Sequence, residues 1–425
     1  MTRLRIHRVS LIFLFFAVTV IAAPAQSAFF TTLVSFDGPN GNFPWAPVIQ
    51  ATDGSFYGTT RWGGANCGSD GCGIVFKITP DGNLRTLYSF CLLPNCADGN
   101  APFAPVVQAA DGDLYGTTEG GGVYSNGTVF KITVAGTLTT LYSFCALGYP
   151  CPDGAGPRTG LVQGTDGNFY GTTGDGGSSN YCEGYNCGTV FKITPQGALT
   201  TLYSFCSQSG CPDGALPYDG LVQGTDGNYY GTTGIGGSNS DCNDYDDGCG
   251  TVFKIAPNGT LTTLYSFCSQ SGCPDGAYPF AGLVQSTDGN FYGTTTGGGT
   301  TDNGTLFKIT PAGALTTLYR FDGTDGSQPY GGLVQATDED FYGTTLNGGT
   351  YGGGTVFKIT SAGTLTTLHN FCAKGWPCAD GSGSEAGLVQ ATDGFFYGTT
   401  GAGGADDYGT VFRIGVVRTC ANCRP

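Results

Sequence analysis

The sequence predicts an all-β protein: a seven-bladed β-propeller with four antiparallel strands per blade, in which an N-terminal strand closes the last blade. Three observations predict this fold. One motif recurs seven times, each repeat contains four strand-like segments, and the two ends of the chain are out of phase with the repeat.

The recurring motif is Tyr-Gly-Thr-Thr. Its copies lie 50 to 62 residues apart, with the tyrosine at Tyr57, Tyr115, Tyr170, Tyr230, Tyr292, Tyr342 and Tyr397. A period of this size is typical of solenoids, arrays and propellers, in which each unit buries its faces only against its neighbours.

Four segments in each repeat have the composition of strands. In the copy at residues 220–267, a short apolar run meets the aromatic Tyr-Gly-Thr-Thr segment at a Thr-Asp-Gly-Asn turn, a strong hairpin signal. A Val-Phe-Lys-Ile segment follows and turns through Pro-Asn-Gly into Leu-Thr-Thr-Leu-Tyr-Ser-Phe. No segment after residue 28 has helical periodicity, which favours an all-β fold.

The ends of the chain predict a closed ring. Residues 31–36 have the pattern of a fourth strand with no repeat before them, whereas the last repeat stops after its third strand at residue 414. An open solenoid gains nothing from this arrangement, but a ring gains backbone hydrogen bonds and loses an exposed edge. We therefore expect the seventh blade to combine residues 386–414 with residues 31–36.

Strand alternation then sorts the loops into two faces. The first-to-second and third-to-fourth connections are tight turns that share one face. The second-to-third and fourth-to-first connections are long and variable, and they share the other face. We expect any function on the long-loop face, because binding residues concentrate on loops held by a rigid scaffold.

The N-terminus has the features of an export signal. Three arginines precede an apolar run from residue 11 to residue 23, and small residues follow. This pattern is typical of a secretory signal peptide and is too short for a spanning helix. We expect a signal peptide at residues 1–28, the propeller at residues 29–418 and a tail at residues 419–425, in a secreted, extracellular product without a membrane span; the periplasm and the cell surface are alternatives.

The net charge of −15 limits the partners. Removing residues 1–28 removes three arginines and no acid, so the mature chain is more acidic still. Such a surface repels polyphosphate, which excludes a nucleic-acid role. We expect a monomer.

The eighteen cysteines fall into nine local pairs, which predict disulfides in an exported chain. The pairs are Cys67/Cys72, Cys91/Cys96, Cys145/Cys151, Cys182/Cys187, Cys206/Cys211, Cys242/Cys249, Cys268/Cys273, Cys372/Cys378 and Cys420/Cys423. Apart from the last pair, all lie in long-face loops. The alternative is metal–thiolate chemistry, which the Cys-x-x-Cys spacing of the last pair could suggest.

Residues that recur in every blade favour structural roles, such as turn caps. They include a cation after each third-strand phenylalanine, an Asp in each first turn and a Gln at the end of each first strand. A further Asp-Gly recurs in six fourth-to-first loops, where calcium is an alternative to turn formation. The most acidic loop, with Asp241, Asp244, Asp246 and Asp247, is also a weak calcium candidate. We expect no cofactor.

Side chains that break the repetition are the candidate functional residues. Glutamates outside the pattern could hydrolyse or cleave sugar chains as paired carboxylates, or could be ordinary surface acids; they are Glu119, Glu183 and Glu385. Aromatic residues outside the pattern could stack on sugar rings, or could pack loops against neighbouring blades; they are Trp45, Trp62, Tyr181, Tyr185 and Trp376. His369 stands where other repeats have Tyr, so we expect it to be a packed strand residue.

The repeat resembles a known family. The run Leu-Val-Gln-x-Thr-Asp-Gly-Asn-Phe-Tyr-Gly-Thr-Thr, followed by Gly-Thr-Val-Phe-Lys-Ile and Leu-Tyr-Ser-Phe, resembles the GloVer-type "choice-of-anchor" tandem repeat of bacterial exported proteins over residues 29–414. The blade pattern is also similar to that of NHL-type propellers. These resemblances imply export and an interaction platform. The family carries varied C-terminal sorting segments, and the absence of an evident one here favours a secreted form.

The sequence therefore favours a secreted binding or interaction module for glycans or for another exported protein. The alternatives are a hydrolase or lyase acting on polysaccharide, and a purely structural envelope protein. An enzymatic function is less favoured than a binding function.

Overall fold

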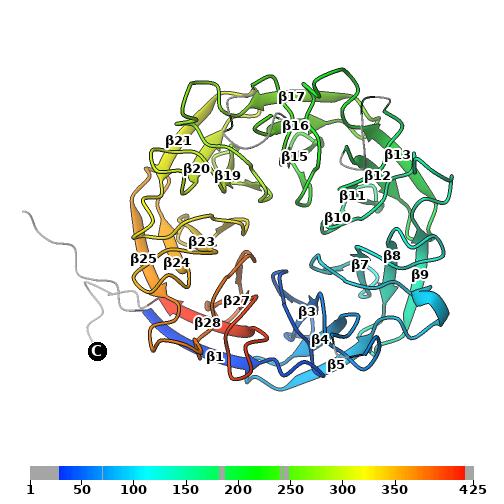
Figure 1. Ribbon diagram of the computed structural model, residues 1–425, viewed down its shortest axis with the longest axis horizontal. Helices are drawn as coiled ribbons and strands as arrows, with labels where there is room; N and C mark the ends of the chain where they lie inside the picture. Colours follow the sequence, from blue (N-terminus) through cyan, green and yellow to red (C-terminus); the bar gives the residue numbers. More distant parts are fainter. Residues whose placement is uncertain are drawn as a thin grey trace, which may run out of the picture.

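The computed structural model describes residues 28–68, 70–179, 181, 187–239, 242 and 248–416. These residues form seven four-stranded antiparallel sheets arranged as blades around a central axis (Figure 1). The predicted signal peptide, except Ala28, and the predicted tail lie outside the described residues.

Each blade has a short inner strand, two middle strands and an outer strand, in sequence order. The first strands are β2 (Ile49–Gln50), β6 (Val107–Gln108), β10 (Val162–Gln163), β14 (Val222–Gln223), β18 (Val284–Gln285), β22 (Val334–Gln335) and β26 (Val389–Gln390). The second strands are β3 (Phe56–Thr60), β7 (Leu114–Thr118), β11 (Phe169–Thr173), β15 (Tyr229–Thr233), β19 (Phe291–Thr295), β23 (Phe341–Thr345) and β27 (Phe396–Thr400).

The remaining strands complete the seven blades. The third strands are β4 (Ile74–Ile78), β8 (Thr128–Ile132), β12 (Thr189–Ile193), β16 (Thr251–Ile255), β20 (Thr305–Ile309), β24 (Thr355–Ile359) and β28 (Thr410–Val416). The fourth strands are β5 (Leu84–Ser89), β9 (Leu138–Ser143), β13 (Leu199–Ser204), β17 (Leu261–Ser266), β21 (Leu315–Arg320), β25 (Leu365–Asn370) and β1 (Ala28–Ser35). A short 3₁₀ turn, η1 (Pro94–Cys96), lies between blades 1 and 2.

The ring closes as the sequence predicts. β1 pairs antiparallel with β28 in the order β1-β28-β27-β26, and Val34 lies opposite Val411. The strand begins at Ala28, earlier than the expected residue 31. The extension is packed, because the ring of Phe30 stacks on His369 with centroids 3.9 Å apart and on Phe412 at 5.1 Å. Blade 7 therefore joins the first and last described segments of the chain.

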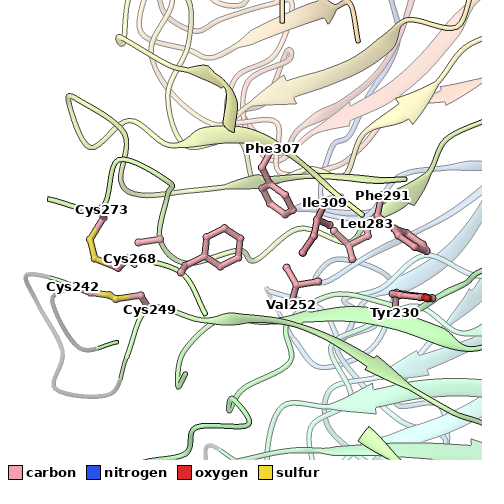
Figure 2. Close-up of a cluster of buried hydrophobic side chains, with 12 residues drawn as sticks. Tyr230, Cys242, Cys249, Val252, Cys268, Cys273, Leu283, Phe291, Phe307 and Ile309 are labelled. Carbon is pink, nitrogen blue, oxygen red and sulfur yellow. A yellow bond between two sulfur atoms is a disulfide. The ribbon is translucent and has the colours of Figure 1, made fainter. Parts of the chain in front are cut away.

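The Tyr-Gly-Thr-Thr motif is explained by packing within and between blades. Gly58 lies opposite Phe76 in the β3–β4 register, and a Cβ at Gly58 would lie 2.5 Å from the Phe76 ring, so only glycine fits. Aromatic rings of second strands stack across six blade junctions at 4.0–4.2 Å. Figure 2 shows such a junction between blades 4 and 5, with Tyr230 and Phe291 in one buried cluster.

The recurring glutamines connect neighbouring blades. Each Gln Oε1 accepts a hydrogen bond of 2.8–3.1 Å from a backbone N–H in the first turn of the preceding blade, and Gln50 accepts from Thr392 across the closure. These seven bonds form a continuous circle on the short-turn face. The predicted structural role of these glutamines is confirmed.

The recurring acids also act structurally. Asp53 accepts hydrogen bonds from the Ser55 backbone N–H, the Tyr57 hydroxyl and the Lys77 ammonium. In the fourth-to-first loops, the fourth-strand tyrosine donates to the recurring Asp, as Tyr88 does to Asp98 at 2.8 Å. His369 makes the equivalent contact with Asp380 at 3.0 Å, and burial lowers its pKa. It is a packed strand residue, as expected.

Candidate functional site

Seven equivalent residues converge on the propeller axis at the long-loop face. Each stands four positions before an inner strand: Trp45, Phe103, Arg158, Tyr218, Phe280, Tyr330 and Glu385. All seven line one cavity of about 210 Å³, to which every blade contributes. We call it the axial cavity.

The backbone before these residues is fixed by proline. Six of the seven follow a proline, and Glu385 follows Ser384. Pro102, for example, packs on Gly73 of the preceding blade, where a Cβ would lie 2.4 Å from the proline Cδ. A rigid φ and this close approach hold the next side chain at the axis.

The aromatic members contact one another around the cavity. Trp45 and Phe103 meet edge to face at 5.1 Å, Tyr218 and Phe280 at 4.9 Å, and Phe280 stacks parallel to Tyr330 at 5.6 Å. These separations are typical of favourable aromatic pairs. The cavity is therefore bounded by a nearly continuous aromatic wall.

Small residues after the second strands make room for this wall. A Cβ at Gly401 would lie 2.7 Å from the Trp45 indole nitrogen, and a Cβ at Gly234 would lie 2.4 Å from the Phe280 ring. Each ring thus lies over the preceding blade. Arg61 and Glu119 occupy the equivalent positions in blades 1 and 2.

An ion-pair network lies beside the aromatic wall. Glu119 accepts from Arg61 at 3.0 Å and from Arg158 at 2.9 Å. The Arg61 guanidinium also lies 4.8 Å from the centre of the Trp45 ring, a cation–π contact. Because Glu119 contacts two guanidinium groups, its side chain is fixed in position between Arg61 and Arg158.

Two carboxyl groups line the axial cavity. Burial raises the pKa of Glu385 to about 7, although the charge of Arg61 opposes the shift. Burial also raises the pKa of Asp219, while the backbone N–H groups of Gly220 and Gly282 donate to its carboxylate and favour ionisation. The cavity therefore offers hydrogen-bond donors and acceptors beside an apolar wall.

The structure brings only some predicted site residues together. Trp45 and Glu385 line the axial cavity, and Glu119 contacts its Arg158. Trp62 lies beside them, 5.1 Å from the Arg61 guanidinium. Trp376 and Tyr181 are 75% and 52% exposed on outer loops and do not line the cavity. Glu183 and Tyr185 lie outside the described residues.

The axial residues that sequence reasoning missed are Phe103, Arg158, Tyr218, Phe280 and Tyr330. A signal was present, because the position four residues before each inner strand changes chemistry from blade to blade while its neighbours repeat. Tyrosine and phenylalanine are common in every repeat, so these residues did not stand out as Trp45 did.

Seven of the predicted disulfides are present among the described residues. They join Cys67–Cys72, Cys91–Cys96, Cys145–Cys151, Cys206–Cys211, Cys242–Cys249, Cys268–Cys273 and Cys372–Cys378. Cys187 is also disulfide-bonded, whereas Cys182, Cys420 and Cys423 lie outside the described residues.

Two pairs of disulfides lie close together. The sulfurs of Cys67, Cys72, Cys91 and Cys96 lie within 4.8 Å of one another, as do those of Cys242, Cys249, Cys268 and Cys273, the latter visible in Figure 2. All eight are oxidised, and bridged sulfurs are not the thiolates that zinc requires. The acidic loop proposed for calcium lies outside the described residues.

Comparison with known families supports the repeat assignment. A family model described as the Gloeobacter/Verrucomicrobia repeat matches residues 17–243 and 242–421. No curated protein matches the sequence. Among the described residues, no helix has the length and apolar character to cross a bilayer.

Solved structures are similar to this chain at low sequence identity. Two structures of the extracellular domain of BT4673 from B. thetaiotaomicron, described as a hybrid two-component and a one-component system, have TM-scores of 0.56 and 0.55 with 13% and 12% identity. Each match covers 91% of this chain but only 39% or 40% of the other chain. The periplasmic gluconolactonase PpgL of Pseudomonas aeruginosa matches at 16% identity, with coverage of 77% and 84% and a TM-score of 0.46.

Proposed function

This chain belongs to the Gloeobacter/Verrucomicrobia repeat family, and we propose that it is an exported binding module that holds a glycan in the axial cavity. The observation that carries the proposal is the convergence of seven divergent residues on one cavity within an otherwise repetitive ring. The blades keep their packing residues and differ where they meet at the axis.

The chemistry of the cavity suits a sugar unit. Flat aromatic rings offer contact area to the apolar faces of a sugar at low entropic cost, and few, placed polar groups fix orientation. Glu385, Asp219 and Arg158 are such groups. A cavity of about 210 Å³ admits one small unit or a chain end, whereas the surface of another exported protein would require a broader contact area.

Export is supported by the disulfides and by the signal-like N-terminus. Disulfides form and persist outside the reducing cytosol, and seven are present among the described residues. We therefore place the binding activity in the extracellular or periplasmic space.

A glycan array followed by calorimetry tests the proposal. We expect the wild-type protein to bind at least one arrayed carbohydrate, and Trp45→Ala to weaken that binding at least about tenfold, equivalent to about 1.4 kcal/mol. Trp376→Ala is the control, because Trp376 is an exposed loop tryptophan away from the cavity. An array without signal would overturn the proposal in favour of a structural envelope protein, as would equal binding by the Trp45 variant.

A second candidate function is polysaccharide hydrolysis or cleavage by a lyase. It is favoured by Glu385, because a carboxyl group with a pKa of about 7 can donate a proton near neutral pH. Glu119 is less suited to this role, since two arginines hold it. Release of reducing ends that Glu385→Gln abolishes while binding persists would establish this function, and binding without product release would exclude it.

A further inference from the structure

A second cavity lies on the long-loop face between blade 2 (β6–β9) and blade 3 (β10–β13). It measures about 450 Å³, more than twice the axial cavity, and falls within the usual range of small-molecule sites. We call it the blade 2–3 cleft.

The cleft adjoins the axial cavity through a shared side chain. Arg158 lines both, and the Glu119 carboxylate that it contacts at 2.9 Å lines the cleft. The two cavities therefore lie on either side of one ion pair. An oligosaccharide that occupied both cavities would therefore pass beside this ion pair.

The polar groups of the cleft suit a hydroxyl-rich ligand. Asp175 lines it, and among the described residues no hydrogen-bond donor reaches the Asp175 carboxylate. Burial and the charge of Glu119 raise the pKa of Asp175, and Arg158 opposes this shift. Ser125, Asn126 and Ser179 add hydroxyl and amide groups. A sugar hydroxyl would give the carboxylate a partner that the described part of the chain does not supply.

An exposed aromatic ring also lines the cleft. Tyr149 lines the cleft and is 78% exposed, on the loop bridged by Cys145–Cys151. A tyrosine in this position offers a platform for a second sugar ring. The site thus has the same two components as the axial cavity, an aromatic surface and a carboxyl group.

The cleft belongs to one junction of the ring. Among the seven residues two positions after the second strands, Asp175 is the only acid; the others are Trp62, Gly120, Ile235, Gly297, Asn347 and Ala402. The blade 6 loop carries Gly-Trp-Pro-Cys where blade 2 carries Gly-Tyr-Pro-Cys, but its Trp376 lines neither cavity. Blade 6 therefore provides a matched aromatic residue without the acid.

We infer that the blade 2–3 cleft is a second sugar subsite, and that with the axial cavity it forms a track for a neutral oligosaccharide. This inference rests on the proposed glycan binding. Neutral sugars are favoured over uronic acids because the described linings of the two cavities hold four carboxyl groups, Glu119, Asp175, Asp219 and Glu385. The two guanidinium groups beside them, Arg61 and Arg158, are both paired with Glu119.

The test compares chain lengths. The probes are the mono- to tetrasaccharides of glucose, galactose, mannose and xylose, with the galacturonate series as the acidic counterpart. We expect one neutral tetrasaccharide to bind wild-type protein at least about tenfold more tightly than its monosaccharide. The double variant Tyr149→Ala/Asp175→Ala should lose that gain and keep the monosaccharide affinity, while Trp376→Ala keeps both.

Two results would overturn the inference while leaving the proposed function intact: a neutral monosaccharide bound as tightly as its tetrasaccharide, or a gain with chain length that survives in the double variant. Preference for the galacturonate series would overturn the assignment to neutral sugars. Binding of no sugar at any length would instead remove the proposed function itself. Thermal melting of each variant separates loss of the subsite from loss of the fold, and Asp175→Asn provides a conservative replacement.

Discussion

Glu385 is the axial residue whose charge changes near neutral pH. Its folded-state pKa of about 7 lies above the usual value of 4.5, so its ionisation opposes folding. The stability associated with the protonated group is fully present below pH 4.5 and is lost as the pH rises through 7.

We expect Glu385→Gln to remove this dependence. Relative to the variant, the wild-type free energy of unfolding should fall by on the order of 2 kcal/mol as the pH rises from 4.5 to 7.5, because each unit of pKa shift corresponds to about 1.4 kcal/mol. Denaturant titrations at several pH values measure the difference. Parallel stability curves for the two proteins would contradict the assignment.

Gly401 is the glycine beneath Trp45. We expect Gly401→Ala to lower the free energy of unfolding by about 1–3 kcal/mol and to shift the tryptophan fluorescence spectrum, because the new methyl group would overlap the indole. Gly174→Ala is the matched control, since its Cβ would meet no atom closer than 3.5 Å at the equivalent place in blade 3. Equal effects in the two variants would refute this packing.

At the axis, the sequence alone could indicate Trp45 and Glu385 but not their surroundings. Both residues break the repeat by type, so they were recognisable without coordinates. Tyr218 and Phe280 line the same cavity as Trp45 only because several blades converge there, a long-range relation that local pattern does not contain. Likewise, Asp175 looks like one of many turn aspartates until the cleft around it is known.

β1 is the strand on which ring closure depends. It contributes the buried side chain of Val34, and Phe36, the residue that follows the strand, is also buried; both pack with Phe56 and Phe76 of blade 1. We expect removal of residues 28–36 to lower the melting temperature sharply, since it exposes the edge of β28 and the core beneath it. An unchanged melting curve would count against closure by this strand.

Two point variants separate the effect of side-chain burial from the effect of deleting the whole segment. Phe36→Ala should cost about 3–5 kcal/mol, because Phe36 is fully buried, whereas Phe29→Ala should cost little, because Phe29 is 53% exposed. Urea denaturation measures both. If the two variants lost similar stability, burial of the Phe36 ring would not account for the contribution of this segment to the stability of the fold.

The strands were predictable because each follows from local chemistry repeated seven times. Thr-Asp-Gly-Asn specifies a tight turn, and the Gly58–Phe76 contact explains a motif that is otherwise unusual inside a strand. The start of β1 at Ala28 was not predictable, since Phe30 is held by His369 and Phe412 from the far end of the chain. The type of each element thus followed from its own residues, whereas the length of β1 depended on tertiary packing.

The molecule as a whole is held by interactions between neighbours. The glutamine circle, the stacked rings and the disulfide loops each join segments within a blade or across one junction. Each disulfide closes a loop of only five to seven residues in sequence separation and contributes about 2 kcal/mol by chain entropy.

We expect peptide mapping without reduction to show only local bridges. The seven described pairs should appear, together with Cys182–Cys187 and Cys420–Cys423, which the sequence pattern predicts. Mild reduction should lower the melting temperature yet preserve the β-sheet circular dichroism, because the blades pack without the bridges. Free thiols or links between chains in the unreduced protein would refute the pairing.

The pairing of Ala28 with Val416 also determines how the protein can be attached to something else. β1 runs toward the long-loop face and β28 runs away from it, so both ends of the described chain emerge on the opposite side of the disc. A tether, tag or neighbouring domain joined at either end therefore leaves the axial cavity and the blade 2–3 cleft pointing outward. The protein can be immobilised or displayed through a terminus with its binding face accessible.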